Sequence, residues 1–80
     1  MTHTFSLAEG VSVDVEIYEG KNGCIITSEK FNLPSGCYRH CKVTCYNGKW
    51  KAWDCSCGER CDGDCVGGVP KGTCSPMVAE

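Results

Sequence analysis

The chain has 80 residues, nine of them cysteines, and a formal net charge of −2. One domain at most fits this length, and its apolar core alone would leave it only marginally stable, so we expect disulfide cross-links. The modest positive charge argues against nucleic-acid binding, and no apolar run is long enough to span a membrane. Residues 1–80 are therefore predicted to form a single cysteine-rich domain.

The cysteine content also predicts a location. Disulfides persist in oxidising compartments, so we expect a secreted, extracellular protein. Residues 1–7 lack the basic start and apolar run of a signal peptide, which predicts a mature form. Residues 1–20 hold four acidic and no basic residues, whereas residues 39–51 hold four basic and no acidic ones. We therefore expect one acidic and one basic edge.

Residues 1–23 contain no cysteine and are predicted to form a β arm. β-Branched residues alternate there with polar ones, as in a half-buried strand: Val11, Val13, Val15 and Ile17. Phe5 and Leu7 continue the alternation upstream of a turn expected at Ala8-Glu9-Gly10. Since no bridge can hold this arm, it must pack on the rest of the domain or on another chain.

Residues 24–74 are the predicted disulfide core, and residues 75–80 are expected to form a loose tail. A short buried strand is expected over residues 24–27, followed by a loop over 28–36 that contains Pro34. Frequent glycines argue against regular structure over residues 55–74.

Asn47-Gly48 is the best hairpin signal, because this pair suits a two-residue type I′ turn. Such a turn would pair Cys45 with Trp50 and Lys42 with Trp53, so that Trp50 faces the core and Trp53 faces solvent. Exposed aromatic and basic groups are typical of protein-binding hot spots, although cation–π pairs could equally serve only to stabilise the hairpin. The predicted partner-binding residues are Phe31, Tyr38, Arg39, Tyr46, Lys49, Lys51 and Trp53.

The cysteines predict about four bridges and one unpaired thiol, without defining the pairing. They are Cys24, Cys37, Cys41, Cys45, Cys55, Cys57, Cys61, Cys65 and Cys74. We expect a monomer, although the odd cysteine could link two chains through a disulfide.

Two cysteine patterns allow other interpretations. Cys41-x3-Cys45 followed by Cys57-x3-Cys61 resembles the twin motif of small, helical chaperones of the mitochondrial intermembrane space, but no helical stripe flanks it. The four cysteines from Cys55 to Cys65 could supply a zinc site, yet none of their spacings is the x2 spacing common in zinc folds. We expect no metal and no cofactor.

Enzymatic chemistry is poorly supported. His40 lies between two cysteines, but a Cys–His nucleophile pair also needs a spare thiolate and an orienting group. No phosphate-binding loop, dinucleotide fingerprint or zinc-protease helix is present. We therefore expect no catalytic residue and no enzymatic activity.

The cysteine frame over about residues 24–74 resembles a known family. Its most specific parts are Leu33-Pro34-x-Gly36-Cys37 and Gly58-Glu59-Arg60-Cys61, with Lys49-Trp50 and two Gly-x-Cys closures at Cys65 and Cys74. These pieces resemble the "basic tail" family of secreted tick salivary proteins, including its tailless members. The resemblance implies an inhibitor that binds a host plasma protein of the complement or coagulation cascade and blocks it without catalysis.

Several features depart from that family. Residues 75–80 are not basic, which favours a complement target over membrane-dependent clotting. Cys45, Cys55 and Cys57 are additional to the cysteine frame of the family, and the N-terminal arm has no counterpart in it. Two alternatives remain at this stage. One is a small protease inhibitor with Tyr38-Arg39-His40 as a reactive loop, and the other is a venom-type channel blocker that uses the same hairpin.

Overall fold

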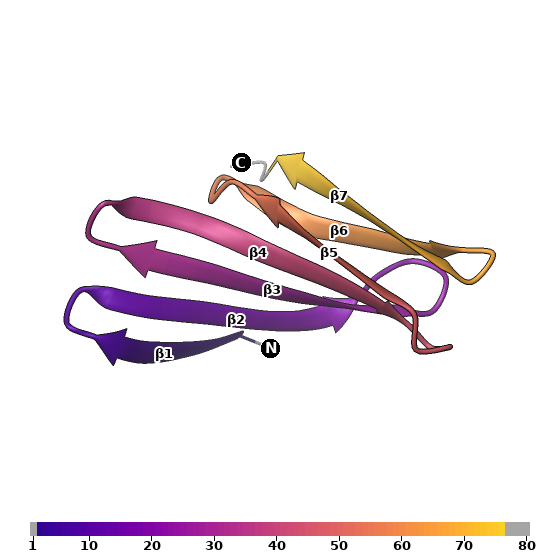
Figure 1. Ribbon diagram of the computed structural model, residues 1–80, viewed down its shortest axis with the longest axis horizontal. Helices are drawn as coiled ribbons and strands as arrows, with labels where there is room; N and C mark the ends of the chain where they lie inside the picture. The colour runs from indigo at the N-terminus through magenta and orange to yellow at the C-terminus, as the bar shows by residue number, and fades with distance from the viewer. Residues whose placement is uncertain (1, 77–80) are drawn as a thin grey trace.

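The computed structural model describes residues 2–76, which form seven β-strands in two antiparallel sheets (Figure 1). The larger sheet has the order β1-β2-β3-β4-β5 and the smaller one pairs β6 with β7. The strands are β1 (Thr2–Ala8), β2 (Val11–Glu19), β3 (Cys24–Leu33), β4 (Gly36–Cys45), β5 (Trp50–Cys55), β6 (Glu59–Val66) and β7 (Val69–Pro76). The predicted small, mostly β, disulfide-rich fold is confirmed. Within residues 2–76, no helix is long and apolar enough to cross a membrane.

The β6–β7 hairpin forms a second layer against β3, β4 and β5 (Figure 1). The core between the layers consists of cysteine and aliphatic side chains, and Ile26 and Val43 are its largest fully buried members. The turn between β2 and β3 joins the layers through its backbone, because Lys21 N donates to Gly63 O and Cys65 N donates to Lys21 O. Tyr18 adds a side-chain link by donating its hydroxyl to Cys61 O.

Three disulfides tie β4 to the β6 segment in a regular ladder. They are Cys37–Cys57, Cys41–Cys61 and Cys45–Cys65, each with a sequence separation of 20. Residues four apart on a strand point to the same face, so the x3 spacing places the Cys41–Cys61 and Cys45–Cys65 rungs between the layers. The first rung lies at the margin, because Cys37 is exposed and Cys57 belongs to the turn before β6. The constant separation means that β4 and β6 run in the same direction. A fourth bridge, Cys55–Cys74, links β5 to β7.

A cross-strand pair of glycines lets the layers approach closely. Gly63 and Gly72 are opposite each other in the β6–β7 hairpin. A Cβ on Gly63 would lie 2.9 Å from Val43 Cγ2, and one on Gly72 would lie 2.4 Å from the Trp53 ring. Any larger residue at these positions would therefore push the second layer away from β4 and β5.

The predicted hairpin at Asn47-Gly48 is present, but its predicted register is wrong. Gly48 has φ +92°, whereas Asn47 does not have a positive φ, and Cys45 N donates to Lys49 O at 2.8 Å. The loop thus holds three residues, the form in which a left-handed glycine follows a type I turn. Thr44 is opposite Trp50 and Cys41 is opposite Trp53, one position from the expected pairing. The two tryptophans consequently exchange faces, with Trp50 exposed and Trp53 half-buried.

Two expected irregular segments are strands. Residues 28–33 extend β3, and only Pro34 and Ser35 separate it from β4. Residues 59–66 and 69–76 form β6 and β7, joined by Gly67 and Gly68, whose φ values of +59° and +79° fit the type I′ turn expected at Asn47-Gly48. Of the tail expected over residues 75–80, the first two belong to β7 and the others lie outside the described residues.

The turn expected near Ala8-Glu9-Gly10 is confirmed, and Gly10 has φ +76°. The valine-rich face of the arm, however, is not turned toward the second layer. The pairing of β2 with β3 places Tyr18 beside the core residue Ile26, whereas Val13 is opposite Phe31 on the other side of the sheet. The polar side of β2 therefore shares a face with the core, and the apolar side is on the opposite face.

Candidate functional site: an open aromatic sheet face

One face of the five-stranded sheet lies away from β6 and β7, and we call it the open face. Directly opposed residues of antiparallel strands project from the same face. Phe5 is opposite Val13, Val13 is opposite Phe31, and Phe31 is opposite Tyr38. The pairing therefore places one apolar or aromatic residue from each of four adjacent strands in a line. We call Phe5, Val13, Phe31 and Tyr38 the aromatic row.

The aromatic row is ordered by its own packing. The rings of Phe31 and Tyr38 stack with centroids 5.0 Å apart and an interplanar angle of 17°. Val13 is only 7% exposed, although no second layer covers it, because side chains on the neighbouring strands enclose it. Phe5 and Tyr38 remain 51% and 45% exposed. The row therefore presents ring surface to solvent from a preorganised sheet.

Charged and amphipathic groups lie beside the aromatic row on the same face. His40 Nδ1 lies 2.9 Å from Asp54 Oδ1, which joins β4 to the edge strand β5. Further along, Lys42 Nζ lies 4.9 Å from the ring centroid of Trp50. An apolar centre with a charged margin is the usual arrangement of a protein-binding surface.

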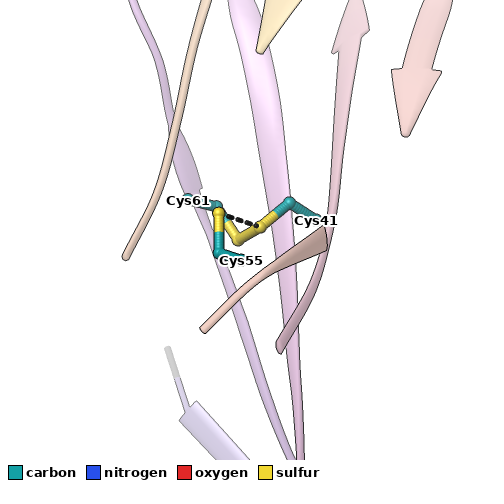
Figure 2. A group of neighbouring side chains, drawn as sticks. All are labelled: Cys41, Cys55 and Cys61. Atoms are coloured by element: carbon teal, nitrogen blue, oxygen red, sulfur yellow. Dashed lines mark hydrogen bonds between the residues drawn. A yellow bond between two sulfur atoms is a disulfide. The ribbon is translucent and has the colours of Figure 1, made fainter. Parts of the chain in front are cut away.

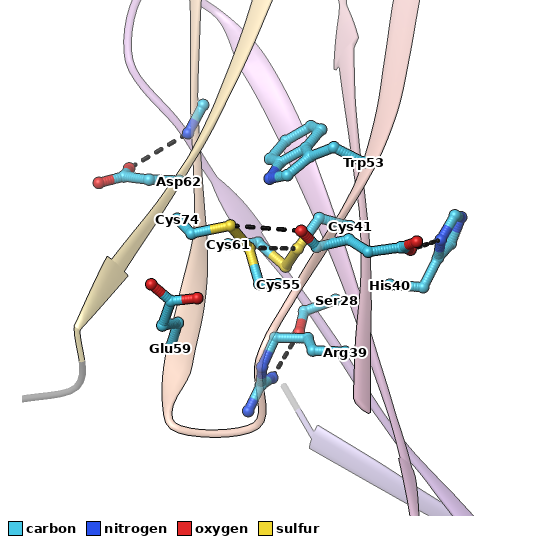
Figure 3. The surroundings of a disulfide bond; sticks show 12 residues. Ser28, Arg39, His40, Cys41, Trp53, Cys55, Glu59, Cys61, Asp62 and Cys74 are labelled. Atoms are coloured by element: carbon cyan, nitrogen blue, oxygen red, sulfur yellow. Dashed lines mark hydrogen bonds and ion pairs between the residues drawn. A yellow bond between two sulfur atoms is a disulfide. The ribbon is translucent and has the colours of Figure 1, made fainter. Parts of the chain in front are cut away.

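The structure does not bring the predicted partner-binding residues together. Phe31 and Tyr38 stack on the open face. Arg39 is only 5% exposed and points the other way, where its Nη1 donates to Ser28 Oγ at 2.6 Å and lies 4.0 Å from Glu16 (Figure 3). Trp53 packs beneath β7 and donates Nε1–H to Thr73 O at 3.1 Å. Tyr46, Lys49 and Lys51 are exposed at or next to the β4–β5 turn.

Two residues of the aromatic row were missed by sequence reasoning, namely Phe5 and Val13. Both belong to the alternation that predicted the arm, but the pattern does not say which face is covered. The expected loop over residues 28–36 also concealed the pairing of Phe31 with Tyr38. The reactive-loop interpretation of Tyr38-Arg39-His40 is contradicted, because these residues lie within β4, between two neighbouring strands.

The densest sulfur cluster is a junction of two disulfides. The Sγ atoms of Cys41, Cys55 and Cys61 all lie within 4.8 Å of one another, and those of Cys41 and Cys55 are 3.4 Å apart (Figure 2). Each of these sulfurs is already bonded to another, in Cys41–Cys61 or in Cys55–Cys74. As disulfides they offer no thiolate to a metal ion, so the cluster acts as a cross-link between the layers.

Cys24 is the one cysteine without a bridge. Its side chain is fully buried at the start of β3, and its thiol donates to Lys21 O at 3.2 Å. Burial raises the pKa of this thiol, and Asp64 adds to the effect. Cys24 and His40 lie on opposite faces of the sheet, since Cys24 belongs to the core and His40 to the open face.

No family model, no curated protein and no solved structure matches the chain.

Proposed function

We propose that this protein is a secreted, non-catalytic binding protein whose open face docks on a host plasma protein of the complement or coagulation cascade and blocks it. The aromatic row is the observation that supports docking. Aromatic side chains are enriched among the residues that dominate binding energy at protein interfaces. The side chains of the aromatic row project from a disulfide-linked sheet, so they lose little further conformational freedom on binding, which favours affinity.

Two other observations support the finer parts of this proposal. Four disulfides fit an extracellular protein, because such bridges persist in oxidising compartments. The choice of target class depends on the resemblance of residues 24–74 to the tick salivary family.

The proposal is tested by capturing partners from host plasma on the immobilised chain and identifying them by mass spectrometry. Phe31→Ala and Tyr38→Ala should each weaken binding to the captured protein by at least roughly 10-fold, as expected for hot-spot residues. Tyr46→Ala is the matched control, because it also removes an exposed tyrosine but lies off the open face. Unchanged affinity for both row variants would refute the use of this face.

Functional assays then separate the target classes. A complement inhibitor should suppress serum haemolysis and leave clotting times unchanged, whereas a coagulation inhibitor should do the reverse. Activity in neither assay, together with block of an ion channel in electrophysiology, would replace this proposal with the channel-blocker alternative.

A further inference from the structure

Three turns meet at one end of the molecule (Figure 1). The turns join β2 to β3, β4 to β5 and β6 to β7, and side-chain contacts connect them. Asn47 Nδ2 donates to Gly68 O at 3.0 Å, and Asn22 Nδ2 donates to Asp64 Oδ1 at 2.6 Å. The ring of Tyr46 lies against Gly23, where an added Cβ would come within 3.0 Å of it. We call residues 19–23, 46–51 and 64–71 the turn tip.

The turn tip exposes apolar side chains that no other part of the fold covers. Tyr46 is 74% exposed although it lies against Gly23. Trp50 is 59% exposed on the open-face side of the tip, and Val66 and Val69, which face each other across the β6–β7 turn, are exposed on the other side. These groups lie at the turns, away from the aromatic row.

The turn tip is also where the positive charge of the chain gathers. It contains four exposed lysines (Lys21, Lys49, Lys51 and Lys71) and two carboxylates, those of Glu19 and Asp64. The rest of the chain has the opposite balance, with four basic residues and eight acidic ones. The turn tip is therefore a basic end of an otherwise acidic molecule, and it takes only Lys49 and Lys51 from the basic edge predicted over residues 39–51.

We infer that the turn tip docks on an anionic lipid surface, a property that goes beyond the proposed function and shares only Trp50, at the margin of the open face, with the surface proposed there. Lysines near an anionic bilayer are attracted to it, while tyrosine and tryptophan favour the headgroup region, where their apolar bodies and polar ends are both satisfied. The acidic remainder does not prevent this contact. The molecule is 43 Å long, and at physiological ionic strength charges are screened over about 8 Å.

The test uses the full chain and two kinds of vesicle, pure phosphatidylcholine and phosphatidylcholine with roughly a third phosphatidylserine. We expect sedimentation with the anionic vesicles only, and loss of binding at high salt. Lys49→Gln and Lys71→Gln should each reduce the partition coefficient roughly 5-fold. Tyr46→Ala should reduce it further, and emission from Trp50 should shift to the blue on binding.

The matched control is Lys30→Gln, which removes the same charge from a position in β3 beyond the tip. A thermal melt of each variant confirms that it is folded. Absence of sedimentation with the anionic vesicles, or equal weakening by Lys30→Gln, would overturn the inference. Binding of the tip lysines to an acidic plasma protein in place of vesicles would overturn it as well. Capture of a plasma protein through the open face is measured without lipid, so the two proposals fail independently.

Discussion

The two halves of the large sheet are held in different ways. Strands β3 to β5 lie under the second layer, and four disulfides fix β4 and β5 to it. The β1–β2 arm shares the same sheet but has no bridge, and Val13 is its one buried apolar residue among those that the structure describes. Covalent links and close packing therefore stabilise one half, whereas strand pairing, the aromatic row and the hydrogen bonds of Tyr18 and Lys21 to β6 stabilise the other. The row crosses the boundary, because two of its members belong to each half.

The largest effect is expected from opening the disulfide ladder at its centre. Replacing Cys41 and Cys61 together with alanine should lower the free energy of unfolding by about 3 kcal/mol, because the bridge closes a loop across 20 residues and both side chains are fully buried. Denaturant unfolding followed by circular dichroism measures the change. Cys24→Ala serves as the control, since it removes a buried thiol without breaking a bridge. An equal loss of unfolding free energy in both variants would show that the disulfides are not what distinguishes this half of the sheet.

Close packing between the layers predicts the next effect. Gly72→Ala should cost about 1–3 kcal/mol, because its Cβ would overlap the Trp53 ring. Gly58→Ala is the control, because its Cβ would meet no atom within 4 Å and should change stability by less than about 0.5 kcal/mol. Thermal unfolding of the two variants provides the comparison. An equal change in stability for both variants would mean that β7 does not pack closely against Trp53.

In the arm, the expected effect is local. Val13→Ala should speed hydrogen exchange of the β1 and β2 amides roughly 10-fold while exchange in β4 and β6 stays the same, because about two methylene-sized groups are lost from a region without bridges. Exchange mass spectrometry with peptide resolution distinguishes the segments. Uniform acceleration throughout the chain would mean that the arm opens only together with the core.

The smallest expected effect is a pH dependence confined to the arm. Asp14 accepts hydrogen bonds from Thr4 Oγ1 at 2.8 Å and from Asn32 Nδ2 at 3.1 Å, and these bonds lower its pKa below the usual 3.8. Their stabilisation is complete above the unfolded-state pKa and is lost as the pH falls through the lower folded-state pKa. Exchange in the arm should therefore accelerate, relative to its intrinsic rate, below about pH 4. The Asp14→Asn variant should lack this dependence.

Sequence reasoning predicted the fold class, the N-terminal hairpin and the central hairpin, because cysteine content, alternation and Asn-Gly are strong local signals. The central turn is in the expected place, but the pairing of its two strands differs from the prediction by one residue. Such a shift moves every side chain of one strand to the opposite face of the sheet. Trp53 was therefore expected in solvent although it packs beneath β7. The glycines of β6 and β7 suggested irregular structure, whereas Gly63 and Gly72 are needed for close approach between strands.

Of the predicted surface, Phe31 and Tyr38 are on the candidate site, and Arg39 is buried beneath it. Local patterns could not separate these neighbours, because the covered face of β4 is defined only by its disulfide partners in the second layer. The available signal for those partners was the match between two evenly spaced sets of cysteines, which places each bridged pair 20 residues apart.

The evenly spaced ladder has a consequence for oxidative folding. Because its rungs repeat every four residues on both strands, sliding β6 by one rung would still bring Cys37 beside Cys61 and Cys41 beside Cys65. The spacing alone therefore does not encode a unique alignment. The slipped isomer would leave Cys45 and Cys57 without partners, while Gly67 would take the place of Gly63 over Val43 and cause no clash there. The observed alignment is therefore selected by its third bridge, since the slipped ladder forms only two.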